Sequence, residues 1–288
     1  MSKLTVIVPV WDDYVPYLDG CLGAIEAQRV GAHVIVVDNA SVVPVDASTA
    51  GLTVVRIPRR VSPGAARNFG LRHVETEYVC FADADDQALP RGWQFLLDRL
   101  AADPSLAACA GQLWWWDDVT GDQRLAPSPR AHVYRHLSGR RRLFFLYALL
   151  RMALPTTTAT IFRTSIVSDA GGYDDSGVAE DWALAAAVAL RGRVELHELP
   201  AARVRIHEGS LFNRHLTRRE VAGGMSRVRQ RVAADPEAPW WVPLLLPLVA
   251  CFHEAKAAAI AARTATRRVI RRPKLELHSP TGTVDHVG

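Results

Sequence analysis

The sequence has few cysteines, and their spacing does not fit a metal site. Its 288 residues contain four cysteines, at positions 21, 80, 109 and 251, and no CxxC pair. Structural zinc sites and disulfide frameworks need closely spaced or regularly paired cysteines. We therefore expect neither feature, and we expect reduced thiols in a cytoplasmic protein.

The sequence also lacks the uninterrupted apolar run of a signal peptide or a membrane-spanning helix. The N-terminus leads directly into a strand-like run, without the basic start and long apolar core of a secretion signal. Segment 238–252 is uncharged, but prolines at 239, 243 and 247 interrupt it. A spanning helix needs about 20 continuous apolar residues. We therefore predict that this segment does not span a membrane.

Strong charge of either sign is missing too. The formal net charge is +4, with 22% charged and 49% hydrophobic residues. This composition is typical of a folded globular protein. The small positive excess suits an anionic ligand such as a nucleotide, but a solvated basic surface explains it equally well. No internal repeat and no long Gly/Ser linker divides the chain.

Strand-like and helix-like segments alternate in the first hundred residues. The predicted strands are 4–10, 33–37, 52–57 and 78–82, and the predicted helices are 17–28, 62–73 and 92–101. Ser62 and Pro63 form a typical helix start, with a hydroxyl at the N-cap and proline at the first helical position. Such alternation predicts a parallel sheet with helices on both faces, whose ligands bind at the carboxyl ends of the strands.

The second half is less regular. It contains predicted strands at 106–116, 159–163 and 194–199, and predicted helices at 141–152 and 181–190. After Arg218 the chain becomes helical and rich in arginine, and a polar tail follows. We expect this tail to be disordered.

The acidic run Asp83-Ala84-Asp85-Asp86 stands directly after a predicted strand. Three carboxylates within four residues repel one another unless a positive charge lies between them. A divalent cation, with phosphate oxygens completing its shell, would relieve that repulsion. A solvated acidic turn that caps the next helix explains the same residues.

Two neighbouring segments favour a phosphate-bearing ligand. The predicted helix at 63–68 begins with small residues, and helix N-termini attract phosphate through free backbone N–H groups. Arg67 adds donors suited to phosphate oxygens, although a surface arginine on an amphipathic helix is equally common. Asp38 is placed to accept a hydrogen bond from a nucleobase or to form an Asx turn.

Four segments, in this order, resemble the N-terminal signatures of family 2 glycosyltransferases, which have the GT-A fold. They are 6–10 with Asp12, 36–41, 64–68 and 81–86, and the resemblance covers about residues 4–89. It implies an α/β fold: a GT-A-like nucleotide-binding domain with a mainly parallel central sheet and a helical C-terminal extension. The implied division is a catalytic domain at 1–215, the extension at 216–275 and a disordered tail at 276–288. Within the catalytic domain, 1–100 would be the nucleotide-binding half and 101–215 the acceptor-side half.

Two later segments are similar to the same family. Residues 171–175 followed by 180–182 resemble the segment that delivers the catalytic base, which implies Asp181 as the base and Glu180 as its support. Residues 205–210 resemble a segment in which a histidine joins the metal and diphosphate site, which implies a role for His207.

The resemblance implies an inverting, metal-dependent sugar transfer from a nucleoside-diphosphate sugar to an acceptor hydroxyl. A UDP-sugar is the favoured donor, with GDP- and dTDP-sugars as alternatives, and the cofactor would be Mn²⁺ or Mg²⁺. Asp85, Asp83 and His207 would hold the metal. The nucleotide sugar would be bound by Pro9, Val10, Asp12, Asp38, Arg67, Asp83 and Ala84.

Two apolar features allow more than one interpretation. Tryptophans 114–116 are suited to stacking on an acceptor sugar, but such clusters more often belong to a core or an interface. The apolar segment 238–252 precedes a helix bearing arginines at 263, 267, 268, 271 and 272. Region 238–272 would either contact the inner face of the membrane peripherally or, as we favour, pack on the catalytic domain or a homodimer partner.

Two other functional classes remain as alternatives. A nucleotidyltransferase should have a glycine-rich, basic loop after the first strand, where residues 9–13 read Pro-Val-Trp-Asp-Asp. A non-catalytic module that binds sugar nucleotides or nucleic acid would not need a base at Asp181. The arginines at 218, 219, 227, 229 and 231 lack the interleaved aromatic residues of single-strand binders, which argues against nucleic acid.

Overall fold

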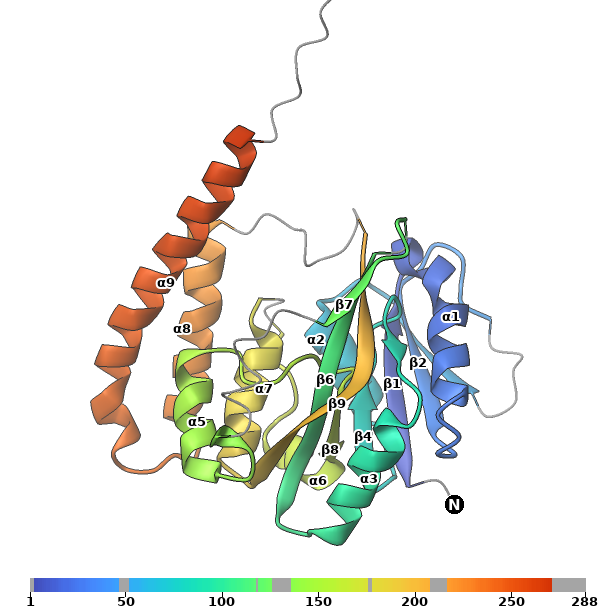
Figure 1. The fold of residues 1–288 in the computed structure, drawn as a ribbon, viewed down its shortest axis with the longest axis horizontal. Coiled ribbons are helices and arrows are strands. Elements are labelled where there is room, and N and C mark those ends of the chain that lie inside the picture. The colour runs from blue at the N-terminus through green and yellow to red at the C-terminus, as the bar shows by residue number, and fades with distance from the viewer. Residues whose placement is uncertain are drawn as a thin grey trace, which may run out of the picture.

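The computed structural model describes residues 3–46, 52–117, 119–125, 136–175, 178–207 and 217–270. Figure 1 shows a central sheet with helices on both sides. The strands are β1 (Leu4–Val10), β2 (His33–Asn39), β3 (Leu52–Ile57), β4 (Tyr78–Phe81), β5 (Gln87–Ala88), β6 (Leu106–Asp117), β7 (Gln123–Leu125), β8 (Thr160–Arg163) and β9 (Arg193–Ile206). The helices are η1 (Asp12–Tyr14), α1 (Val15–Glu26), α2 (Pro63–Leu71), α3 (Gly92–Ala102), α5 (Arg141–Leu150), α6 (Thr164–Asp169), α7 (Glu180–Ala189), α8 (Arg218–Ala234) and α9 (Val242–Ile270).

Within the described residues, nine strands form one sheet in the order β3-β2-β1-β4-β8-β6-β9-β5, with β7 paired to β6. The first four strands of that order are parallel, whereas β8 runs antiparallel to both β4 and β6. The predicted α/β architecture with a mainly parallel central sheet and C-terminal helices is confirmed. Because β1, β2 and β4 are parallel, the polar loops that follow them meet at one edge of the sheet.

Both faces of β1 are buried, which explains its continuous run of apolar residues. Val6 and Val8 pack in the core formed with α1 and α3, whereas Ile7 packs in the second core with α2. All seven residues of β1 are buried. A parallel strand covered by helices on both faces needs such a run, and it gives the loop after Val10 a rigid base.

Helix α2 starts as the sequence predicts. The Ser62 hydroxyl accepts a hydrogen bond from the backbone N–H of Ala65 at 3.1 Å, and Pro63 occupies the first turn. The cap satisfies one of the free donors at the helix start.

Helix α2 is clamped to the glycine turn that precedes α7. The Asn68 side chain accepts a hydrogen bond from the Tyr173 N–H at 2.7 Å and donates one to the Tyr173 carbonyl at 2.9 Å. Gly172 has a φ of +67°, and a Cβ there would lie 2.3 Å from the Asn68 side-chain oxygen. A Cβ on Gly64 would lie 2.4 Å from the carbonyl of Asp174. These contacts bring two sequence segments about a hundred positions apart into one unit.

Strand β9 is longer than predicted. It continues through Pro200 to Ile206, and its pairing with β6 changes register around Gln112. The predicted end at residue 199 is therefore wrong, because β-bulges let the ladder continue past the missing N–H of proline. The extension carries Arg205 and the following His207 to the loop after β4.

The prolines of the C-terminal segment do not interrupt its helix. Pro247 lies inside α9, so the predicted interruption there is wrong. Proline at this position removes one hydrogen bond, to the carbonyl of residue 243, and that carbonyl lies in the exposed first turn. Within the described residues one stretch, Val242–Ala262 of α9, is long and apolar enough to cross a bilayer, judged by length and composition alone. The tail at 276–288 lies outside the described residues.

Candidate active site

A pocket of about 260 Å³ opens where the loops after β1 and β4 face the start of α7. It combines acidic residues from two distant segments of the chain with aromatic side chains from the loop after β1. Its lining residues are Pro9, Trp11, Tyr14, Pro63, Arg67, Asp83, Ala84, Asp85, Asp86, Thr156, Glu180, Asp181 and Val204.

Thr158 holds the acidic loop after β4 in place. Its hydroxyl accepts a hydrogen bond from the Asp83 backbone N–H at 3.2 Å and donates one to the Asp86 carboxylate at 2.9 Å. Asp86 is buried. Burial, followed by the charges of Asp83 and Asp85, raises the pKa of Asp86 well above its usual value. Asp86 thus anchors the loop, while the side chains of Asp83 and Asp85 remain at the pocket.

Asp85 lines the pocket, and His207 lies beside it. The His207 Nε2 atom is 3.1 Å from an Asp85 carboxylate oxygen. Burial and the charge of Asp83 raise the pKa of Asp85, and the hydrogen bond from His207 partly offsets this. Tyr14 and Tyr17 contact the imidazole ring, with centroid distances of 6.0 Å and 5.0 Å. The predicted pairing of these two residues is therefore present in space, although 122 positions separate them in sequence.

Arg67 lies between the acidic loop and the start of α7. Its guanidinium donates to Asp83 at 2.5 Å and to Glu180 at 2.5 Å, and it lies 3.8 Å from Asp181. It also stacks on the ring of Tyr173 at 5.0 Å. The Arg67 side chain is 5% exposed. Its terminal nitrogens thus neutralise carboxylates, an arrangement that the sequence did not suggest.

Glu180 and Asp181 line the pocket from the start of α7. Burial raises the pKa of Glu180 to about 7, although the charge of Arg67 opposes this change. Burial also raises the pKa of Asp181, again opposed by Arg67. The Glu180 side chain is 11% exposed, whereas that of Asp181 is 35% exposed. Asp181 is therefore the more accessible of two carboxylates that bind protons more readily than usual.

Four predicted site residues, Val10, Asp12, Asp38 and His207, are not among the residues that line the pocket. Val10 is buried and pairs with Asp38, at the ends of β1 and β2. Asp38 accepts hydrogen bonds from Ser41 and from Val45 and forms an ion pair with Arg56. Burial alone would raise the pKa of Asp38, but these partners lower it.

Asp12 accepts a hydrogen bond from the backbone N–H of Val42 at 2.6 Å. In this structure Asp12 and Asp38 hold the loop that follows β2, and their predicted contact with a nucleotide remains a prediction.

Several pocket residues were not among those predicted. Trp11 lies under the guanidinium of Arg60, 4.8 Å from its ring centroid, and Arg60 is exposed. Thr156 lines the pocket and Thr158 holds its acidic loop. Thr156 and Thr158 belong to a run of three threonines before β8, and this polar run could have indicated both residues. Nothing in the sequence links Arg60 to Trp11.

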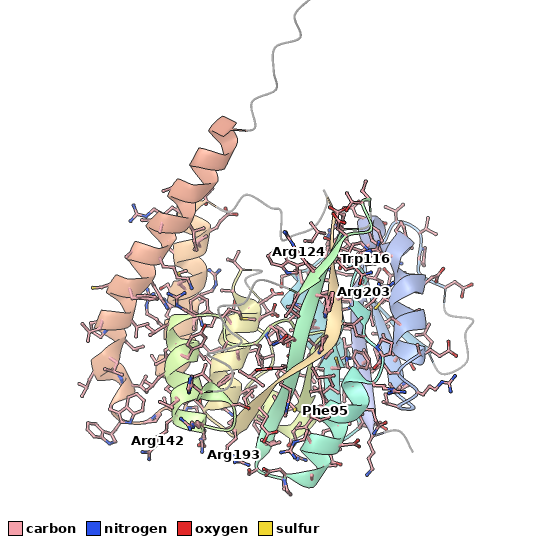
Figure 2. The ribbon with its side chains drawn as sticks, viewed as in Figure 1. Phe95, Trp116, Arg124, Arg142, Arg193 and Arg203 are labelled. Atoms are coloured by element: carbon pink, nitrogen blue, oxygen red, sulfur yellow. The ribbon has the colours of Figure 1, made fainter. Side chains whose placement is uncertain are left out.

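The tryptophan run alternates between the two faces of β6. Trp116 lies between Arg203 and Arg205, whose guanidinium carbons are 4.2 Å and 4.1 Å from its ring (Figure 2). Trp115 pairs in register with Val204, which lines the pocket, and has Arg124 at 5.2 Å. Trp115 is therefore on the pocket side of the strand, and Trp116 is on the other face.

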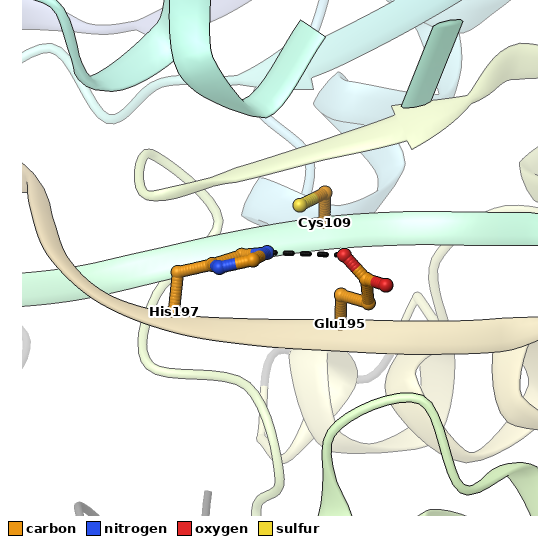
Figure 3. Close-up of side chains that lie close together, drawn as sticks. All are labelled: Cys109, Glu195 and His197. Carbon is orange, nitrogen blue, oxygen red and sulfur yellow. Dashed lines mark hydrogen bonds and ion pairs between the residues drawn. The ribbon is translucent and has the colours of Figure 1, made fainter. Parts of the chain in front are cut away.

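A second cluster of metal-type side chains lies away from this pocket. Among the described residues, Cys109, Glu195 and His197 have ligand atoms within 4.8 Å of one another (Figure 3). However, the Glu195 carboxylate accepts two hydrogen bonds from Arg99, at 3.0 Å and 3.1 Å. Burial raises the pKa of Cys109, which keeps it a thiol. We interpret this cluster as an ion pair that joins α3 to β9, since Arg99 already neutralises the carboxylate.

The family of the chain is shown by the segment that supplies most of the pocket residues. Residues 5–168 match the model of the family described as Glycosyl transferase family 2, which is more than half of the chain. The chain belongs to glycosyl transferase family 2. Membership makes it an enzyme of sugar transfer, so neither the nucleotidyltransferase nor the non-catalytic binding module is retained.

One relative and two solved structures are similar to this glycosyltransferase. Over 179 residues it is 28% identical to the pre-mycofactocin glycosyltransferase of Mycobacterium tuberculosis, a match covering 60% of this chain and 36% of that protein. It thus spans little more than a third of the relative's length. TarS 1–349 of S. aureus, in complex with UDP-GlcNAc, has a TM-score of 0.63 at 17% identity, with 93% of this chain and 73% of TarS covered.

The mannosyltransferase PcManGT from Pyrobaculum calidifontis, in complex with GDP-Man and Mn²⁺, has a TM-score of 0.59 at 19% identity. That match covers 94% of this chain and 76% of the mannosyltransferase. At these identities both solved structures support the fold of this chain.

Proposed function

We propose that this enzyme transfers a sugar from a nucleoside diphosphate to an acceptor hydroxyl by a metal-dependent, inverting reaction. The observation that carries the proposal is the position of Arg67. One buried guanidinium contacts Asp83 of the acidic loop and Glu180 of α7. Carboxylates from two distant segments of the chain, with different surroundings, therefore line the same pocket. An inverting transfer needs charged groups for both the leaving diphosphate and the acceptor hydroxyl, and these two segments can supply them.

The leaving-group side suits a divalent cation. Asp85 and His207 offer a carboxylate oxygen and an imidazole nitrogen 3.1 Å apart, and burial without a cation leaves Asp85 with a raised pKa. Asp83 lies beside them, but one of its oxygens accepts a hydrogen bond from Arg67. The imidazole favours Mn²⁺ over Mg²⁺, since Mg²⁺ prefers oxygen ligands. When bound, the cation would neutralise negative charge that develops on the departing diphosphate.

The acceptor side supplies the base. Asp181 removes the proton from the acceptor hydroxyl as that oxygen attacks the anomeric carbon. Glu180 forms an ion pair with Arg67 and so keeps the guanidinium 3.8 Å from Asp181. The positive charge of Arg67 favours the ionised form of the Asp181 carboxylate. Burial raises the pKa of both carboxylates, which suits a base that works near neutral pH.

The donor and acceptor are proposed at the level of chemical class. A UDP-sugar is favoured, since TarS is described with UDP-GlcNAc, and GDP-sugars remain an alternative because PcManGT is described with GDP-Man. A dTDP-sugar is the third candidate. Pro9 and Ala84 line the donor side of the pocket, and Trp115 is on the same face as the pocket residue Val204. A glycan, a lipid-linked saccharide and a natural product are the candidate acceptors.

A thermal-shift panel of nucleotide sugars tests this proposal. The correct donor binds the folded state, so it should raise the unfolding midpoint on the order of 5 °C at a concentration of about 100 Kd. The shift should require Mn²⁺ or Mg²⁺ and should be selective for one nucleotide. If no nucleotide sugar shifts the midpoint with either metal, the proposed function fails.

Substituting Asp85 should remove the metal dependence. In Asp85→Asn the ligand loses its charge, so we expect the Mn²⁺-dependent part of the donor shift to disappear and transfer to fall by at least about 100-fold. Asp98→Asn, on the exposed side of α3, is the matched control and should keep both. A full Mn²⁺-dependent shift in Asp85→Asn would contradict the assignment of this ligand.

The rate of transfer should rise with pH. A base acts in its deprotonated form, and burial raises the pKa of Asp181 above its ordinary value. We therefore expect kcat/KM to increase with pH above the ordinary titration range of an aspartate and then to level off. Glu180→Gln should move this limb to lower pH, because it removes a neighbouring negative charge and leaves Arg67 to interact with Asp83 and Asp181 only. Glu77→Gln, at an exposed ion pair, should leave the profile unchanged.

A further inference from the structure

One side of α9 is apolar and exposed along most of its described length. Trp240 is 82% exposed, Leu244 68% and Leu248 70%. The other exposed positions follow at helical spacing on the same side. The exposed side includes Trp240, which precedes the helix, and Leu244, Pro247, Leu248, Cys251, Ala255, Ala258 and Ala259, and we call it the α9 face. Glu254 is exposed beside these residues and forms an ion pair with Arg218 of α8 at 3.5 Å.

The opposite side of α9 is packed on the catalytic domain. Val249, His253 and Ala257 are buried. His253 lies 2.9 Å from the backbone carbonyl of Leu149 in α5 and 2.8 Å from Arg229 of α8. The α9 face therefore belongs to a helix that is fixed in place, and its exposure does not come from a detached segment.

Basic and apolar side chains of α5 continue the α9 face. Trp241 contacts Phe145 with a ring distance of 6.1 Å, which places the start of α9 beside α5. On α5, Leu143 is 44% exposed and Leu146 is 36% exposed. The arginines Arg140, Arg142 and Arg151 are exposed around them, and Figure 2 shows Arg142 near the start of α9. The patch is thus apolar at its centre and positively charged at its rim.

This charge pattern selects the kind of partner. In a two-fold dimer through this patch, the same basic rim would be present on both copies, and like charges would repel. A spanning helix is also excluded by packing, since α8 runs along α9 with charged residues such as Arg218 and Arg229. Carrying α9 across a bilayer would take those charges into hydrocarbon. An apolar face with a basic rim instead fits the surface of an anionic bilayer.

We propose that the α9 face, with the exposed side of α5, docks the enzyme on anionic phospholipid surfaces. Trp240 and the leucines enter the boundary between headgroups and acyl chains, and the arginines pair with lipid phosphates. The folded catalytic domain remains in water. This proposal does not depend on the identity of the donor sugar or on Asp181 as the base.

Sedimentation with vesicles tests the proposal on the full chain. The protein should bind phosphatidylglycerol vesicles at low salt, bind pure phosphatidylcholine vesicles about tenfold less, and be released as salt is raised. Leu244→Glu/Leu248→Glu should weaken binding by about tenfold or more, because two charges would enter the apolar layer. Trp240→Ala should weaken it by a smaller factor.

The controls separate docking from misfolding and from dimer formation. Ala101→Glu/Ala102→Glu adds the same charge at two exposed positions at the end of α3, and it should bind vesicles like the wild type. All variants should keep the wild-type unfolding midpoint and donor-induced thermal shift. The proposal is overturned if the wild type ignores phosphatidylglycerol vesicles at low salt, or if Leu244→Glu/Leu248→Glu binds them normally. It is also overturned if analytical ultracentrifugation shows a dimer that this variant dissociates.

Discussion

Asp181→Asn is expected to reduce kcat by about 10²–10⁴-fold, because asparagine keeps the shape of the side chain but cannot accept a proton. Donor binding should survive, since Arg67 contacts Asp83 and Glu180 more closely than Asp181. The measurement is nucleoside diphosphate release from donor and acceptor, alongside the thermal shift caused by donor alone.

Two comparisons make the test of Asp181 specific. Asp169→Asn changes an exposed carboxylate of α6 and should leave kcat within about twofold of the wild type. Glu180→Gln reports on the neighbouring carboxylate, which is 11% exposed. If Asp181→Asn retains most of its activity while Glu180→Gln loses it, the base is Glu180 and the present assignment is wrong.

Arg67→Met is expected to destabilise the protein by about 3–5 kcal/mol, the usual cost of removing one partner from a buried ion pair. Methionine keeps much of the volume, so the loss reports chiefly on charge. Without the guanidinium, the pKa of Glu180 should rise above its present value of about 7. Since its unfolded value is about 4.5, the folded state loses stability as pH rises through that range, and the destabilisation should be larger at pH 8 than at pH 5.

Chemical denaturation of three variants beside the wild type measures this effect. Glu180→Gln in the Arg67→Met background should recover part of the lost stability, because it removes the charge left without a partner. Arg218→Ala breaks an exposed pair with Glu254, whose side chains are 62% and 52% exposed, and should cost less than about 1 kcal/mol. Equal losses for Arg67→Met and Arg218→Ala would contradict the role of the buried network.

The sequence was sufficient to predict which strand ends meet at the edge of the sheet where the pocket lies. Apolar runs bounded by polar residues predict β1, β2 and β4, and parallel pairing then brings their ends to one edge. The helix start at Ser62 was predictable because its capping depends on residues next to it in sequence. The pairing of Asp85 with His207 followed from family resemblance, not from any local pattern.

The central role of Arg67 could not be predicted from the sequence. Its partner Glu180 is 113 positions away, and their contact depends on the clamp between Asn68 and the turn at Tyr173. Local pattern suggested a free guanidinium for phosphate, whereas packing buries it among carboxylates. The place of Pro247 inside α9 was unpredictable for a related reason. The free energy that a proline costs in a helix depends on whether the carbonyl of residue 243, which loses its hydrogen bond, can bond to water.

Contacts of Arg231 cross the predicted domain boundary near residue 215. From α8 Arg231 donates hydrogen bonds to the carbonyls of Ala170 and Gly172, in the turn that leads to the pocket carboxylates. From α9, Lys256 lies over the ring of Trp182, directly after Asp181. We propose that the C-terminal helices serve as a brace for the base, so a shortened enzyme without them would keep its donor loops but lose the support of its acceptor side.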